Sequence, residues 1–134
     1  MFKLVKIING RQNVPEPEYL PTTSGVTYKI GDALVITSGA LVKATGTTRP
    51  THISMKTLTG TGAEIPVARI EKNMVFEAPV TYSSTANTIV LGSKLTVSDN
   101  STGVTDVTTD GVATVVDTLG ANKKLGDKVL VIFE

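Results

Sequence analysis

The sequence contains no cysteine and a single histidine, and these two scarcities exclude several kinds of site. Without cysteine, neither a disulfide framework nor a thiolate metal site can form. With His52 alone, a metal site with two histidine ligands is impossible, and a Ser-His-Asp arrangement would have to use this one residue. The cysteine and histidine side chains that hydrolytic and metal-dependent active sites commonly use are therefore absent or limited to one residue.

The single histidine lies in an alternating run that is typical of a β-strand. Ile53 and Met55 fall on one face of such a strand, and His52 and Ser54 fall on the other. This pattern favours a histidine on the surface of a strand over a catalytic histidine.

Aromatic residues and an excess of one charge are also scarce. The chain has three phenylalanines, three tyrosines and no tryptophan, and its 13 basic and 12 acidic side chains give a formal net charge of +1. Binding of single-stranded nucleic acid uses aromatic platforms on a basic face, and anionic membranes attract basic surfaces. No apolar stretch approaches the roughly 20 residues that span a bilayer. We therefore expect neither nucleic acid nor a membrane as a partner.

Two loops carry residues that could suggest a ligand. The segment 59–64 contains Gly60 and Gly62, but no Gly-Lys-Ser/Thr follows, and the next residues read as a strand where a phosphate-binding loop needs a helix. The segment 99–103 lacks the spacing and the closing glutamate of a helix-loop-helix calcium site. We interpret both as turns and predict no catalytic, metal-binding or cofactor-binding residue, and thus no enzyme. A site assembled from dispersed Asp, Glu, Arg and Thr side chains remains an open alternative.

What the chain has in abundance is β-branched residues and turn residues. It contains 21 threonines, and valine and isoleucine recur at alternating rather than helical spacing. Strands are predicted over residues 2–8, 33–37, 41–44, 52–57, 65–71, 74–80, 94–98, 104–108, 112–117 and 128–133. Turn signals at hairpin spacing lie between many of them. The sequence therefore predicts an all-β fold, a small antiparallel β-barrel or β-sandwich.

One phrase occurs three times: an apolar residue, glycine, Asp or Ser, and then alternating apolar positions. It stands at residues 30–36, 91–97 and 125–131. Glycine adopts backbone angles closed to other residues, and the Asp or Ser after it can hydrogen-bond the local backbone. We predict that Gly31, Gly92 and Gly126 are structural turns that each start a strand.

Residues 13–21 differ from the rest because prolines recur there. Proline fixes φ and has no N–H, so we expect an extended arm that cannot lie in a sheet interior. The predicted organisation is an N-terminal strand and arm over residues 1–24 and one barrel-like domain over 25–134. The arm either straps the first strand across the domain or docks on a neighbouring subunit or partner. The candidate contact residues are Val14, Pro15, Pro17, Tyr19, Leu20 and Pro21.

Four segments together resemble a known family, and they lie at residues 28–35, 39–44, 49–55 and 64–70. Their layout is similar to that of the head decoration, or capsid cement, proteins of tailed bacteriophages, over roughly residues 25 to 80. The resemblance implies an all-β, barrel-like domain that binds the outside of a matured head and reinforces contacts between major capsid protein subunits, often as a trimer. We therefore expect a structural virion protein, made in the host cytoplasm and located on the outer capsid surface, with the major capsid protein and further copies of itself as partners. The alternative is another structural or adhesive β module, such as a fibre, tail or cell-surface domain.

Overall fold

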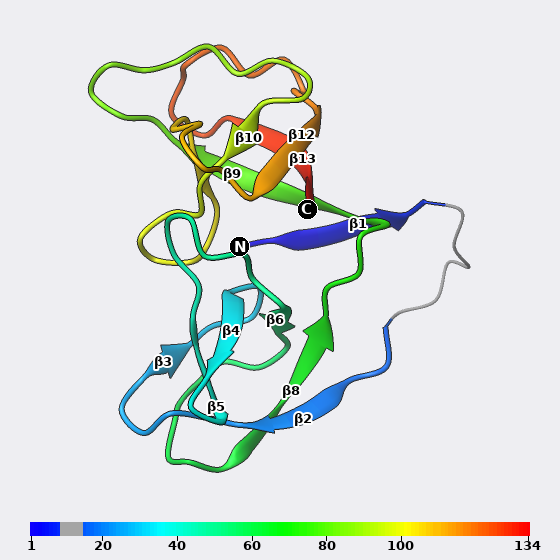
Figure 1. The fold of residues 1–134 in the computed structure, drawn as a ribbon, viewed down its shortest axis with the longest axis vertical. Helices are drawn as coiled ribbons and strands as arrows, with labels where there is room; N and C mark the ends of the chain where they lie inside the picture. Colours follow the sequence, from blue (N-terminus) through cyan, green and yellow to red (C-terminus); the bar gives the residue numbers. More distant parts are fainter. Residues whose placement is uncertain (9–14) are drawn as a thin grey trace.

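The regular elements of the chain are all β-strands in the computed structural model, which describes residues 1–8 and 15–134 (Figure 1). The strands are β1 (Lys3–Ile7), β2 (Glu18–Pro21), β3 (Thr27–Tyr28), β4 (Ala33–Thr37), β5 (Ala40–Lys43), β6 (His52–Ser54), β7 (Leu58–Thr59), β8 (Glu64–Arg69), β9 (Met74–Thr81), β10 (Lys94–Leu95), β11 (Val104–Thr105), β12 (Ala113–Asp117) and β13 (Lys128–Phe133). Within the described residues no helix is long and apolar enough to cross a membrane. The predicted all-β class is confirmed.

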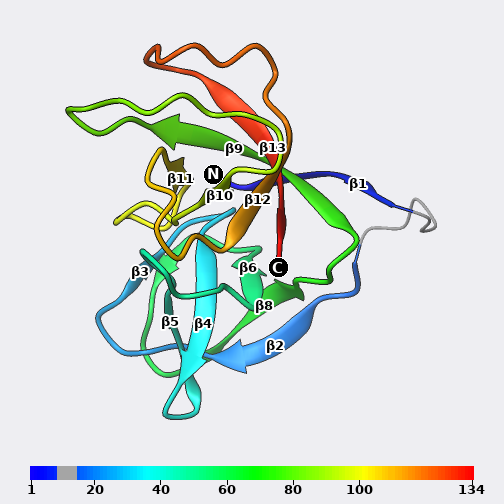
Figure 2. The ribbon, with the colours of Figure 1, turned by 45° about the horizontal axis from the view of Figure 1, so that its top comes forward.

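The strands form two large sheets and one small one (Figures 1 and 2). The six-stranded sheet has the order β1-β9-β13-β12-β10, with β11 pairing in parallel to β9. The five-stranded sheet has the order β2-β8-β6-β4-β5, and β3 pairs with β7. Neither large sheet closes into a barrel among the described residues, although an isolated bridge between Thr22 and Leu41 joins the two ends of the five-stranded sheet.

The five-stranded sheet covers a small core of its own. Side chains alternate between the faces of a strand, so Ile65 and Val67 point to the same side of β8. This side carries a compact cluster of Tyr28, Leu34, Leu41, Ile65 and Val67. The hydroxyl of Tyr28 donates a 2.5 Å hydrogen bond to the carbonyl oxygen of Leu41, so the one polar atom of this ring is satisfied inside the cluster.

The main core lies between the two large sheets. Ala33 and Ile53 of the five-stranded sheet belong to the same buried cluster as Phe76 and Phe133 of the six-stranded sheet. The ring of Phe133 lies 5.3 Å from that of Phe2 and 5.6 Å from that of Phe76, centroid to centroid. Of the two predicted architectures, the arrangement is thus that of a sandwich of two sheets.

Strand positions agree with the prediction where alternation is long. β4 and β13 coincide with the predicted segments 33–37 and 128–133. The predicted strand 52–57 instead ends at Ser54, because the Ser54 hydroxyl bonds both the N–H and the carbonyl oxygen of Lys56 and closes a local turn. The predicted strands 94–98 and 104–108 shorten to the two-residue β10 and β11, and β2, β3 and β7 were not predicted as strands.

Candidate functional site

The proline-bearing segment is built into the fold at one edge of the five-stranded sheet. Val14 lies outside the described residues, and Pro15 and Pro17 precede β2, which contains Tyr19, Leu20 and Pro21. β2 pairs antiparallel with β8, and β1 pairs with β9, so residues 1–24 contribute one strand to each large sheet. The segment stays out of a sheet interior, as its prolines require, but its second half is an edge strand rather than a free arm.

The register of β2 determines which of its backbone N–H and C=O groups face the open edge of the sheet. Tyr19 lies opposite Pro66, whose carbonyl oxygen accepts a 3.1 Å hydrogen bond from the N–H of Met55 on the other side of β8. The N–H and C=O of one strand residue point to the same side, so Tyr19 and Pro66 form a non-hydrogen-bonded pair. The backbone N–H and C=O of Tyr19 therefore point away from β8, toward the outer edge.

The side chains of β2 divide between partner-facing and core-facing roles. The Tyr19 side chain is 61% exposed, and Pro17 is exposed as well. Leu20 instead packs against the small core of the five-stranded sheet. Of the six predicted contact residues, Leu20 thus anchors the strand, whereas Tyr19 and Pro17 are available at the surface.

Glu18 anchors the start of β2 through a cluster that the sequence did not reveal. Arg69 of β8 donates two hydrogen bonds to the Glu18 carboxylate, from Nε at 2.6 Å and from Nη2 at 3.1 Å. His52 of β6 places Nε2 3.4 Å from the same carboxylate, and its Nδ1 lies 2.9 Å from the Thr51 hydroxyl. The Arg69 contact holds the pKa of Glu18 below its usual range, although partial desolvation opposes this. The Glu18 carboxylate therefore contacts two basic side chains, those of Arg69 and His52.

The prediction that His52 lies on a strand surface is wrong. The residue is only 2% exposed, and all three residues of β6 are buried. Burial lowers the pKa of His52, and Arg69 acts in the same direction, whereas Glu18 opposes them without prevailing. The sequence gives no sign of this, because alternation shows which residues share a face but not whether other segments bury that face.

The repeated glycine phrase folds into the same turn at all three positions. Gly31, Gly92 and Gly126 have φ values of 86°, 83° and 90°. The side chain after each glycine accepts a hydrogen bond from the N–H three residues earlier: Lys29 to Asp32 at 2.9 Å, Val90 to Ser93 at 3.1 Å and Lys124 to Asp127 at 2.9 Å. A strand begins at the next residue each time, β4, β10 and β13. The repeated glycine phrase is therefore a turn that immediately precedes a strand at all three positions.

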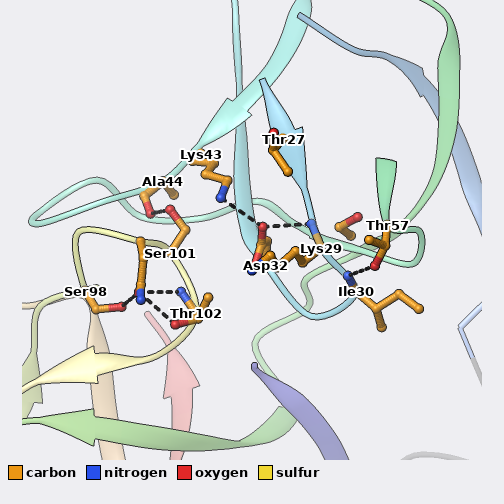
Figure 3. Close-up of polar contacts among 12 residues, drawn as sticks. Thr27, Lys29, Ile30, Asp32, Lys43, Ala44, Thr57, Ser98, Ser101 and Thr102 are labelled. Carbon is orange, nitrogen blue, oxygen red and sulfur yellow. Dashed lines mark hydrogen bonds and ion pairs between the residues drawn. The ribbon is translucent and has the colours of Figure 1, made fainter. Parts of the chain in front are cut away.

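The acidic residues of two of these turns also have partners elsewhere. Asp32 is fully buried and pairs with Lys43 of β5, with Nζ 3.2 Å from Oδ2 (Figure 3). Asp127 accepts a 2.7 Å hydrogen bond from the Tyr82 hydroxyl, and burial together with this carboxylate raises the pKa of Tyr82 to about 12. Both carboxylates thus tie their turn to a second segment.

The loop 99–103 links the two large sheets through a side-chain hydrogen bond. The Asn100 side-chain oxygen accepts hydrogen bonds from Ser98 Oγ, just before the loop, and from the N–H and hydroxyl of Thr102. Ser101, at a φ of 62°, donates from its hydroxyl to the carbonyl oxygen of Ala44, as Figure 3 shows. The predicted turn is present, and the side chains of Asn100, Ser101 and Thr102 form hydrogen bonds within the protein.

Asp106, a buried acid three residues after this loop, has a similar structural role. Its carboxylate accepts hydrogen bonds from the N–H and hydroxyl of Ser83, at 2.8 and 3.0 Å, and from the N–H of Asn87 at 2.7 Å. Burial raises the pKa of Asp106 more than any single hydrogen bond lowers it, but the bonds from Asn87 and Ser83 together hold it below the usual range. This carboxylate therefore fixes the chain that follows β9.

In residues 1–8 and 15–134, no three His, Cys, Asp or Glu side chains come together as a group that could hold a metal ion. No family model, curated protein or solved structure matches the chain. The candidate site is the outer edge of β2, where the Tyr19 side chain is exposed.

Proposed function

We propose that this protein is a structural virion protein that binds the outer surface of a phage head and reinforces contacts between major capsid protein subunits. The resemblance over roughly residues 25 to 80 supports the class, and the all-β sandwich is compatible with it. Like the family it resembles, it acts as an oligomer on the head, with a trimer favoured. It acts through surface shape rather than through chemistry.

The exposed ring of Tyr19 is the observation that supports the proposed contact with the capsid or with a neighbouring subunit. A tyrosine that is 61% exposed adds nothing to the core, yet Leu20 and Glu18 on either side hold its strand firmly in place. Rigidly presented tyrosines are common anchors of protein interfaces because they bury a large area at a small entropic cost. We assign Tyr19, with Pro17, to the contact with the capsid or with a neighbouring decoration subunit.

The test is binding to heads. Purified full chain is mixed with undecorated mature heads of its own phage and sedimented with them. The Tyr19→Ser variant should bind at least about tenfold more weakly, because truncation of a central interface tyrosine typically costs about 2 kcal/mol. Its melting temperature should stay close to that of the parent, since the ring lies outside the core.

The matched control is Leu125→Ser, which removes a fully exposed apolar side chain from the turn that precedes β13. It should bind heads like the parent chain. If this variant loses binding while Tyr19→Ser retains it, the assigned contact is wrong. If the parent chain itself fails to bind heads whose surface sites are empty, the proposed function is wrong.

A further inference from the structure

Exposed branched apolar side chains lie at one end of the six-stranded sheet. β10 and β12 are antiparallel, so the chain before β10 and the chain after β12 lie at the same end. Hydrogen bonds from Gly92 N–H to the Val115 carbonyl oxygen, at 2.9 Å, and from Val115 N–H to the Ser93 carbonyl oxygen, at 2.8 Å, hold the two segments side by side. Such a group of exposed apolar side chains commonly marks a binding surface. The apolar patch consists of Val90, Leu91, Val116 and Leu119.

Leu119 is held in this patch at a conformational cost. Leu119 and Gly120 have φ values of 48° and 74°, and Ala121 donates a 2.8 Å hydrogen bond to the carbonyl oxygen of Thr118. These features define a type I′ turn, whose first central position suits Asn, Asp or Gly and is unfavourable for leucine. The Asp117 carboxylate fixes the turn by accepting the N–H of Leu119 at 2.9 Å. A side chain that is both strained and exposed is typical of a functional contact.

The charge around the apolar patch is mainly positive. Three exposed lysines, Lys94, Lys123 and Lys124, lie in or next to the segments that carry it. Asp117 and Asp127 also lie at this end, but both accept hydrogen bonds from the chain itself. Two copies of the patch would therefore meet with like charges, which disfavours a two-fold contact of patch with patch. We expect the occupant to present an apolar ring or chain among acidic groups.

The outer edge of β2 has this complementary character. The ring of Tyr19 is exposed there, and Glu16 is exposed three residues earlier. Glu64, at the start of the neighbouring β8, is exposed as well. Arg69 is bound to Glu18, so it does not cancel the charges of these two glutamates. An aromatic ring with acidic neighbours thus lies on the same chain as an apolar patch with basic neighbours.

We propose that the partner of Tyr19 is a second copy of this chain, whose apolar patch receives the Tyr19 ring. The inference rests on the proposed function, which leaves open whether Tyr19 contacts the capsid or a neighbouring subunit. Glu16 and Glu64 of one copy then lie near the lysines around the patch of the next. The contact joins two different surfaces and is therefore heterologous, the kind of contact that can close into a ring such as a trimer.

Sedimentation of the isolated full chain over a series of concentrations tests this docking without heads. The parent should self-associate, and Leu119→Asn should weaken the association at least about tenfold, because it removes an apolar anchor. Asparagine suits the type I′ turn, so the melting temperature of the variant should equal or exceed that of the parent. A merely structural role of Leu119 would lower the melting temperature and leave the association unchanged.

The matched control is again Leu125→Ser. Leu125 precedes β13, which lies on the other side of β12 from β10, and is not part of the patch. This variant should associate like the parent.

Exchange of charges tests which two surfaces meet. Replacement of both Glu16 and Glu64 by lysine should weaken association severalfold, and so should replacement of both Lys123 and Lys124 by glutamate, because each places like charges across the contact. All four changes in one chain should restore association. Further weakening in the fourfold variant would overturn the docking.

The outcomes separate the docking from the proposed function. Self-association that these variants alter as expected, without binding to heads, would contradict only the proposed function. A parent chain that stays monomeric would overturn the docking, and if it still binds heads through Tyr19, the contact is with the capsid. Binding of the monomeric parent to phosphatidylglycerol vesicles, abolished by Leu119→Asn, would overturn the docking and assign the patch to a lipid surface.

Discussion

Replacement of Phe133 by alanine is expected to lower the free energy of unfolding by about 3–5 kcal/mol, the range found for buried phenylalanines. Phe133 is completely buried at the end of β13 and is the ring that both Phe2 and Phe76 contact. Its removal would leave a cavity between three segments that are far apart in the sequence. Chemical unfolding of the variant, followed by circular dichroism, measures the loss.

The neighbouring residue provides a matched control. Ile132 lies on the opposite face of β13 and is only half-buried. Ile132→Ala removes an apolar side chain from the same strand and should therefore cost clearly less, about 1–2 kcal/mol. Equal losses in the two variants would mean that the main core does not lie on the Phe133 side.

The second large effect is expected at Gly31. An alanine there would place its Cβ 2.5 Å from Met1 Cβ and 3.0 Å from the carbonyl oxygen of Phe2, at a φ of 86°. The strained positive φ costs about 1–2 kcal/mol of stability and overpacking costs about 1–3 kcal/mol. Gly31→Ala should therefore lower the free energy of unfolding by about 3 kcal/mol. Thermal and chemical unfolding give the value.

Gly92 and Gly126 separate these two contributions. Both have positive φ, but a Cβ at either position would meet no atom within 4 Å. Gly92→Ala and Gly126→Ala should therefore lower the free energy of unfolding only by the cost of the strained φ, about 1–2 kcal/mol each. Three equal losses would contradict the packing of the N-terminus against Gly31, and three unchanged stabilities would contradict the role of the phrase as a turn.

Local patterns in the sequence predicted much of this fold because the interactions that set them are local. Alternation placed β4 and β13, and the glycine phrase identified three turns whose hydrogen bonds span only three residues. The same reasoning kept the proline segment out of a sheet interior.

Features that depend on distant segments could not be read from the sequence. Asp110 and Gly111 are one of the turn signals between predicted strands, yet a Cβ on Gly111 would collide with the backbone of Lys94 and Leu95, which lie beside it only after folding. The contacts of His52 likewise come from β2 and β8, and Glu18 lies 51 positions from Arg69. Strand pairing decides these contacts, and composition and periodicity do not specify which strands pair.

The survival of heads on heating tests the proposed function most directly. Undecorated mature heads are heated with and without saturating full-length protein, and the release of packaged DNA is followed by the fluorescence of an intercalating dye. If each bound copy strengthens contacts between capsid subunits, the release temperature should rise with occupancy and level off when the sites are full, because many modest contacts act together. Heads that carry the protein at full occupancy and still release DNA at the temperature of bare heads would contradict a cement function.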